Sequence, residues 1–244
     1  MKKQNPIQPV ENPIICGPYE EPESHWHYKE GMASKIGGRR PAGYWYKTNA
    51  VGKKQMELFT EEHRDDLPLV NLLREDIKQW RKNNYRNATN VTKELLRYWA
   101  KEDRFRRFFF CQKEAVETLI YLMEIRIPEK YSRTDAKRFK LSQENLRNLI
   151  RGVNPKFKEQ SASTDYYHTL ADTPADESLL PLLRMGCKMA TGSGKTVIMA
   201  MLISWAFCNR GQYPDNTLFP NAVLICCPNL TVKSVTQKTT VWGF

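Results

Sequence analysis

Residues 182–227 read LLRMGCKMATGSGKTVIMAMLISWAFCNRGQYPDNTLFPNAVLICC, and this stretch decides the fold. The apolar run LLRMGCKM is typical of a short buried strand, a glycine-rich turn follows it, and KTVIMAMLISWAFC has the pattern of a helix. A polar loop then leads to a second apolar run, AVLICC. Strand, helix and strand within about 45 residues form a βαβ unit with parallel strands and a right-handed crossover. We therefore expect an α/β fold here.

The turn between the first strand and the helix has the composition of a phosphate-binding loop. Its glycines let consecutive backbone N–H groups converge on phosphate oxygens, and the helix that follows presents the positive end of its dipole. Lys195 is expected to reach the β- and γ-phosphates, and the Thr196 hydroxyl to ligate Mg²⁺. These two are the candidate catalytic residues. The candidate ATP-binding residues of the turn are Thr191, Gly192, Ser193, Gly194, Lys195 and Thr196.

The turn departs from the general pattern G-x-x-x-x-G-K-[ST], because Met189 stands where the first glycine is expected. The stretch MATGSGKT resembles motif I of superfamily 2 helicases and translocases, especially the restriction-enzyme-like members. The resemblance implies a P-loop lobe of the RecA-like type, with ATP and Mg²⁺ as cofactors and nucleic acid as partner.

Two further segments fit the same family. RRFFFCQKEAVETL, residues 106–119, resembles its Q-motif region, in which a glutamine flanked by aromatic residues opens a helix. Gln112 is then expected to hydrogen-bond adenine, because one amide offers both a donor and an acceptor. AVLICCPNLTVK, residues 222–233, resembles motif Ia, whose turn holds a phosphate of the nucleic acid strand. Asn229, Thr231 and Lys233 are the nucleic-acid candidates in that turn.

The order of segments narrows the resemblance. HWHYKEG and GGRRPAGYWY near the N-terminus, the Gln112 segment, a long insertion and MATGSGKT follow one another as in DEAD/DEAH-like proteins identified as type III restriction enzyme helicase subunits. The resemblance implies DNA as the nucleic acid. It also implies a second chain, either a methyltransferase subunit or one that supplies a helicase lobe.

The remaining sequence divides by composition. Residues 1–60 are rich in proline, glycine and aromatic residues and predict an extended arm. Residues 61–125 carry three amphipathic helical patterns and include the Gln112 segment. Residues 126–181 are interpreted as an insertion with one short helix near 143–151, capped by Ser142, and residues 182–244 as the start of the RecA-like lobe.

Charge and apolar content restrict the partners and the cellular compartment expected for the protein. The 244-residue chain has 38 Lys and Arg against 27 Asp and Glu, a net charge of +11, which suits an anionic partner. No run approaches the about 18 apolar residues of a membrane-spanning helix, and the N-terminus has no apolar signal segment. The six cysteines include no C-x-x-C pair. We expect a reduced, cytoplasmic protein with no membrane partner.

Hydrolysis at such a turn needs a second carboxylate to hold Mg²⁺ and position water, together with arginines from a second lobe. After Lys195 the sequence has one acidic residue, Asp215, within the turn-like YPDN. We therefore expect a truncated, frameshifted or split protein that ends after motif Ia and is not hydrolytic alone.

Two alternative functions and one candidate metal site stay open. The isolated chain fits a catalytically inactive nucleotide- or DNA-binding remnant or regulatory subunit. A small P-loop phosphotransferase also fits the turn, but it needs a carboxylate and an arginine lid downstream, where Arg210 is the one arginine. His25 and His27 alternate around Trp26, so a strand would place both imidazoles on one face, either as metal ligands or as an ordinary packed or exposed pair. The lack of a Cys or third His nearby in the sequence favours the ordinary pair.

Overall fold

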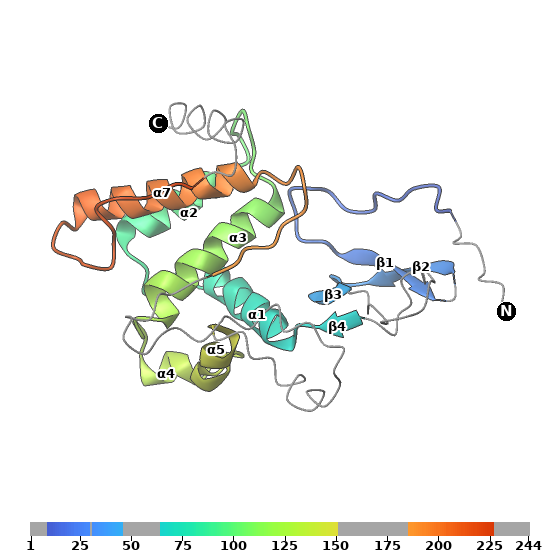
Figure 1. Ribbon diagram of the computed structural model, residues 1–244, viewed down its shortest axis with the longest axis horizontal. Helices are drawn as coiled ribbons and strands as arrows, with labels where there is room; N and C mark the ends of the chain where they lie inside the picture. Colours follow the sequence, from blue (N-terminus) through green and yellow to red (C-terminus); the bar gives the residue numbers. More distant parts are fainter. Residues whose placement is uncertain (1–8, 30, 46–63, 151–184, 227–244) are drawn as a thin grey trace, which may run out of the picture. The chain divides into compact units, whose positions relative to one another are not determined.

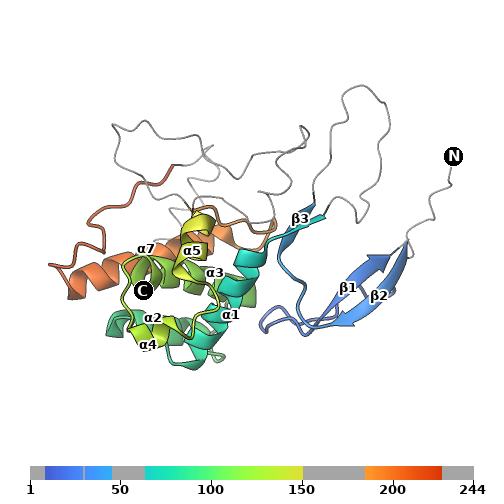
Figure 2. The ribbon, with the colours of Figure 1, turned by 90° about the horizontal axis from the view of Figure 1, so that it is seen from below.

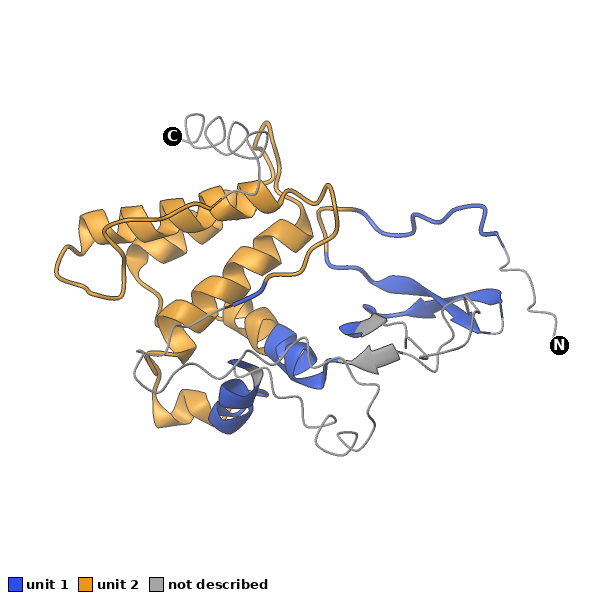
Figure 3. Ribbon diagram, in the orientation of Figure 1, with its two compact units in different colours: residues 1–17, 21–75, 140–186 blue, residues 18–20, 76–139, 187–244 orange. Residues whose placement is uncertain are grey.

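The computed structural model describes residues 9–29, 31–45, 64–150 and 185–226 (Figure 1). The chain divides into two compact units (Figure 3). The first comprises residues 1–17, 21–75 and 140–186, and the second residues 18–20, 76–139 and 187–244. The predicted boundaries at residues 60 and 181 lie outside the described residues. The predicted boundary at residue 125 falls inside a continuous helical segment of the second unit.

A β-hairpin occupies the first unit where the sequence predicted an extended arm. Strands β1 (Ser24–Lys29) and β2 (Met32–Gly37) are antiparallel (Figure 2). In their register His25 lies opposite Ile36. The connection is two residues long, and its Gly31 has a φ of 84°, a conformation that favours glycine. The glycine within YKEGMA, between two segments of strand length, is the sequence pattern that indicates this turn.

A second strand pair leads into the first helix. β3 (Gly43–Trp45) pairs antiparallel with β4 (Arg64–Asp66), and α1 (Pro68–Lys82) follows at once. The Leu67 N–H donates to the Ala42 carbonyl across 2.8 Å, and the Ala42 N–H donates to Asn71 Oδ1 across 2.7 Å. Pro68 suits the first helical position, where its missing N–H has no intrahelical partner.

Helix α5 (Gln143–Ile150) lies where the sequence predicted a short helix. The Asn145 N–H donates to the Ser142 hydroxyl across 3.1 Å, which is the expected capping contact. Leu146 is buried on its apolar face.

Helices make up most of the second unit. After the end of α1 come α2 (Asn90–Ala100), α3 (Phe110–Ile120), the π-helix η2 (Tyr121–Arg126), α4 (Arg133–Ala136) and α7 (Lys195–Gln212). Helix α7 lies against both α2 and α3 (Figures 1 and 2). α1, α2 and α3 correspond to the three amphipathic patterns of the sequence. Large apolar side chains buried in this unit are Ile77, Trp80, Leu96, Trp99, Val116, Ile120, Tyr121, Ile125, Ile198, Met201, Trp205 and Phe219.

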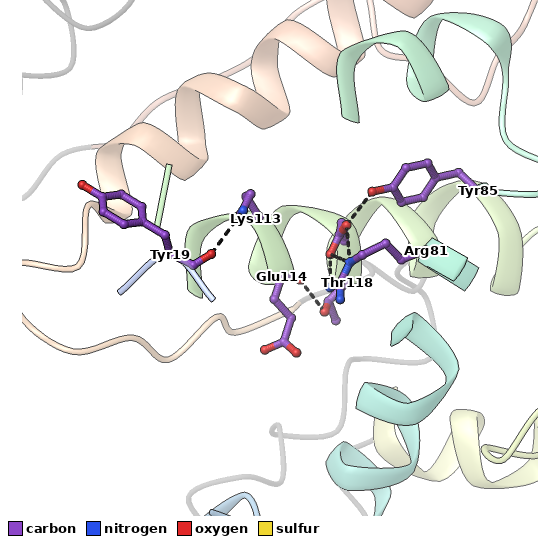
Figure 4. Close-up of polar contacts among 7 residues, drawn as sticks. Tyr19, Arg81, Tyr85, Lys113, Glu114 and Thr118 are labelled. Atoms are coloured by element: carbon purple, nitrogen blue, oxygen red, sulfur yellow. Dashed lines mark hydrogen bonds and ion pairs between the residues drawn. The ribbon is translucent and has the colours of Figure 1, made fainter. Parts of the chain in front are cut away.

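Buried charges accompany this apolar core. Arg126 is fully buried, its Nη1 lies 3.1 Å from Asp76 Oδ2, and its guanidinium lies 4.2 Å from the centre of the Phe139 ring. Glu117 on α3 accepts hydrogen bonds from Arg81 and from the Tyr85 hydroxyl (Figure 4). Burying a carboxylate is costly unless it is paired and hydrogen-bonded. The carboxylates of Asp76 and Glu117 both meet that condition.

The two strands predicted on either side of α7 are not formed in the described residues. Residues 185–190 and 222–226 take part in no strand, and Leu224 is 88% exposed. The described sheets are two antiparallel pairs. An apolar run becomes a strand only where a neighbouring strand satisfies its backbone N–H and C=O groups, and the described residues place none beside these two runs. The parallel sheet of a RecA-like lobe therefore stays a prediction.

No helix in the described ranges combines the length and the apolar character needed to cross a membrane.

Candidate functional site

The glycine-rich turn at residues 190–194 is a compact left-handed loop that opens α7. Gly192 has a φ of 79° and Gly194 a φ of 82°, values that L side chains rarely adopt. The Ser193 N–H and hydroxyl both donate hydrogen bonds to the Ala190 carbonyl oxygen, across 3.3 and 2.6 Å respectively. Gly194 is the N-cap of α7, so the free N–H groups of the helix begin at the turn.

Lys195 folds back over this turn. Its Nζ donates to the carbonyl oxygens of Met189 and Ala190, at 3.2 and 2.9 Å, and the side chain is exposed. The ammonium group is thus held beside the loop by neutral acceptors. A phosphate that enters the loop offers a charged acceptor in their place, which forms a stronger hydrogen bond.

Helix α7 carries the turn on a rigid support. Its buried residues are Ile198, Met201, Trp205, Ala206 and Asn209, which recur at three- and four-residue steps. The helix is 18 residues long, and its apolar face packs on α2 and α3. The turn is therefore attached to the core of the second unit.

A buried polar network fixes the middle of α7 around Glu124. The carboxylate of Glu124, on η2, accepts from the Thr92 hydroxyl at 2.7 Å and from Trp205 Nε1 at 3.1 Å. The Thr89 N–H donates to its other oxygen at 2.6 Å. Asn209 joins through the hydroxyls of Thr89 and Thr92. The network links α2, η2 and α7 with its donors and acceptors satisfied, which favours one packing over others.

Gln112 connects α3 to the glycine-rich turn. It is 5% exposed, its Oε1 accepts from the Phe109 N–H at 2.9 Å, and its Nε2 donates to the Ser193 carbonyl at 3.0 Å. A Cβ at position 194 would overlap Nε2. The sequence predicted that the Gln112 amide hydrogen-bonds adenine, and in the structure its oxygen and nitrogen are bound to backbone groups of Phe109 and Ser193. Adenine recognition by this residue stays an interpretation of the sequence, and the contacts of the amide favour a role in positioning the turn instead.

Next to Gln112, Lys113 lies in a partly buried position. Its Nζ donates to the Tyr19 carbonyl across 3.4 Å (Figure 4). Burial lowers the pKa of Lys113, and the positive charges of Arg107 and Arg81 act in the same direction, while Glu117 opposes them. The first turn of α3 therefore carries two neighbouring side chains with different contacts. Gln112 binds the glycine-rich turn, and the Lys113 ammonium binds the Tyr19 carbonyl.

Asp215 lies far from the turn. It is exposed and follows the C-terminal end of α7. At about 1.5 Å per residue the helix separates its two ends by about 27 Å. A carboxylate at that end does not reach a metal held at Thr196.

The other sequence candidates have different outcomes. Asn229, Thr231 and Lys233 lie outside the described residues. His25 Nδ1 lies 2.8 Å from the Gly38 carbonyl, and the described residues contain no group of His, Cys, Asp or Glu arranged to hold a metal ion.

Sequence reasoning missed Glu124 and the contact between Gln112 and Ser193. The sequence did contain a signal for Glu124, because this glutamate lies inside the apolar run LIYLMEIRI. A buried charge there is costly unless it has partners. No local pattern indicates the contact between Gln112 and Ser193, because 81 residues separate its partners.

Comparison of the chain with protein-family models, curated proteins and solved structures finds no match.

Proposed function

We propose that this chain binds the triphosphate of ATP with Mg²⁺ at residues 191–196, as the N-terminal part of an ATP-dependent DNA helicase or translocase of a restriction or defence system. The observation that carries the proposal is the left-handed turn through Gly192 and Gly194. It opens α7 and holds the Lys195 ammonium 2.9 Å from the Ala190 carbonyl.

The donors at the turn fit a polyphosphate and its metal. The first turn of α7 follows the loop directly, so the positive end of the helix dipole lies beside it, and Lys195 adds a full positive charge. Thr196 follows directly and provides the hydroxyl that suits Mg²⁺, a metal that binds oxygen ligands. When bound, Mg²⁺ would neutralise phosphate charge. The part played by the chain is to hold the phosphates and orient the metal-binding hydroxyl.

Binding without turnover is the behaviour we propose for the isolated chain. Phosphoryl transfer is accelerated by charges and a positioned water at the γ-phosphate. Asp215, the one acidic residue after Lys195, lies beyond the opposite end of α7. The second candidate function is a catalytically inactive nucleotide- or DNA-binding remnant or regulatory subunit, with which the exposed position of Asp215 beyond the opposite end of α7 also agrees. A partner chain that restores ATP hydrolysis would support the helicase proposal over this alternative.

The test is titration calorimetry of the 244-residue protein with a non-hydrolysable ATP analogue and Mg²⁺. Removing the Lys195 charge in Lys195→Ala should weaken binding by about tenfold or more, since a charge-assisted hydrogen bond contributes about 1.5–3 kcal/mol. Lys188→Ala is the matched control, because Lys188 is an exposed lysine before the turn. Equal affinity of the wild type and Lys195→Ala, with unchanged helix content, would overturn the proposal.

A further inference from the structure

The loop between α2 and α3, residues 101–109, presents arginines and phenylalanines in alternation. Its sequence is KEDRFRRFF. Phe105 is 98% exposed, and Arg106 beside it is also exposed. A phenylalanine with nearly its whole ring in water has not used its apolar surface within the fold, so burying it on a partner is favourable. We name residues 101–109 the arginine–phenylalanine loop.

Two arginines of this loop are already ordered on aromatic rings. The Arg104 guanidinium lies 4.3 Å from the centre of the Tyr98 ring and 4.7 Å from that of Phe108. Its Nε is buried and has no hydrogen-bond partner among the described residues. The Arg107 guanidinium lies 4.5 Å from the centre of the Tyr19 ring. These stacked groups stiffen the loop, which reduces the entropy lost when a partner binds.

The charges and rings together indicate the chemistry of the partner. Residues 101–109 carry four positive and two negative charges, and Arg107 pairs with Glu102 across 3.9 Å. Arg106, which is exposed, adds its charge beside Phe105, and the chain as a whole has a net charge of +11. An aromatic ring stacks on an unpaired base of any identity, while neighbouring arginines attract phosphates. In a duplex the base faces are stacked on one another and are not offered to a protein ring. An apolar protein partner would cover the ring but would have to desolvate Arg106.

We propose that the arginine–phenylalanine loop binds single-stranded nucleic acid, with Phe105 stacked on a base and Arg106 on a phosphate. This inference rests on the nucleic-acid partner of the proposed function, but it does not depend on nucleotide binding at the turn.

The experiment is fluorescence anisotropy of a labelled oligothymidylate of about 20 nucleotides, titrated with the full chain between about 50 and 200 mM salt. Phe105→Ala should weaken binding by about tenfold, since stacking on one base is lost. Arg106→Ala should reduce the slope of log affinity against log salt by about 0.7, the value for one phosphate of a single strand. Phe207→Ala and Arg133→Ala, both at exposed positions of the same unit, are matched controls that should bind as the wild type does.

Three outcomes would overturn the inference. The first is wild-type affinity in Phe105→Ala. The second is a preference for duplex over single strand that Phe105→Ala leaves unchanged. The third is loss of self-association in Phe105→Ala, measured by light scattering, with oligonucleotide binding intact, which would make the loop a protein contact. Lys195→Ala should bind the oligonucleotide normally, so failure at the phosphate turn and failure at this loop are distinguishable.

Discussion

The amide nitrogen of Gln112 lies 3.0 Å from the carbonyl oxygen of Ser193 and donates a hydrogen bond to it. The amide oxygen of the same side chain accepts from the Phe109 N–H at the start of α3. One buried glutamine thus ties the first turn of α3 to the peptide that precedes Gly194. The conformation of the glycine-rich turn therefore depends on a residue from a distant part of the sequence.

We predict that Gln112→Ala weakens the binding of ATP and GTP analogues to a similar extent, because the turn loses a donor that fixes Ser193. Competition between the two analogues in calorimetry checks this. Gln143→Ala, on α5 in the first unit, is the control and should change neither affinity. A mutant that loses only its preference for ATP over GTP would contradict the positioning role and support adenine recognition.

We predict that Gly194→Ala abolishes analogue binding or strongly reduces it. A methyl group there would overlap Gln112 Nε2, and the φ of 82° is strained for alanine. Gly211→Ala on the same helix is the matched control, because its Cβ would meet no atom within 4 Å. Alanine should stabilise that position by about 0.5–1 kcal/mol, which thermal unfolding measures. Wild-type affinity in Gly194→Ala would show that the turn tolerates a different backbone path.

We predict that Trp205→Phe lowers the free energy of unfolding by about 2 kcal/mol or more, because Glu124 and Thr92 both lose a buried donor. Urea denaturation followed by far-UV circular dichroism measures the change. Phe207→Leu alters a half-exposed side chain on α7 and should stay within about 0.5 kcal/mol of the wild type. An equal effect of the two substitutions would mean that the Glu124 network does not stabilise α7.

We predict a tyrosine-dependent loss of stability at high pH. Burial, and then the negative charge of Glu117, raises the pKa of Tyr85 above its ordinary value. The unfolded chain releases this proton near about pH 10, whereas the folded chain retains it. The contribution of Tyr85 to stability is therefore complete below about pH 10 and is lost as the pH rises through the raised pKa.

The measurement is urea unfolding of the wild type, Tyr85→Phe and Tyr98→Phe at about pH 9 and about pH 11. Tyr85→Phe should lose less free energy of unfolding between the two pH values than the wild type does. Tyr98→Phe, at an exposed position, should follow the wild type. Parallel losses in all three proteins would show that Tyr85 does not carry the effect.

Local patterns in the sequence predicted part of this arrangement correctly. The glycines at 192 and 194, and the helix that begins at Lys195, depend on neighbouring residues only, as does the capping of α5 by Ser142. The helices α1, α2 and α3 follow from apolar residues at three- and four-residue steps.

The rest depends on contacts between distant residues. AVLICC has the composition of a buried strand, yet composition does not supply the neighbouring strand that would pair with it. Gln112 has the pattern of an exposed helix-opening residue, and only the approach of Ser193 makes it buried. Glu124 is likewise explained only when Thr92 and Trp205 are brought together.

The hydrogen bonds between residues far apart in the sequence have a consequence for how the second unit folds. Thr89 and Asn209 are hydrogen-bonded across 120 positions of the sequence, and Gln112 and Ser193 across 81. Helix α7 therefore joins α2 and α3 by closing a long loop, a step that slows folding more than the formation of local helices does. The entropy of closure grows only logarithmically, so doubling the intervening chain costs about 0.6 kcal/mol. The number of residues between the two partners is accordingly expected to affect the folding rate more than the stability of these contacts.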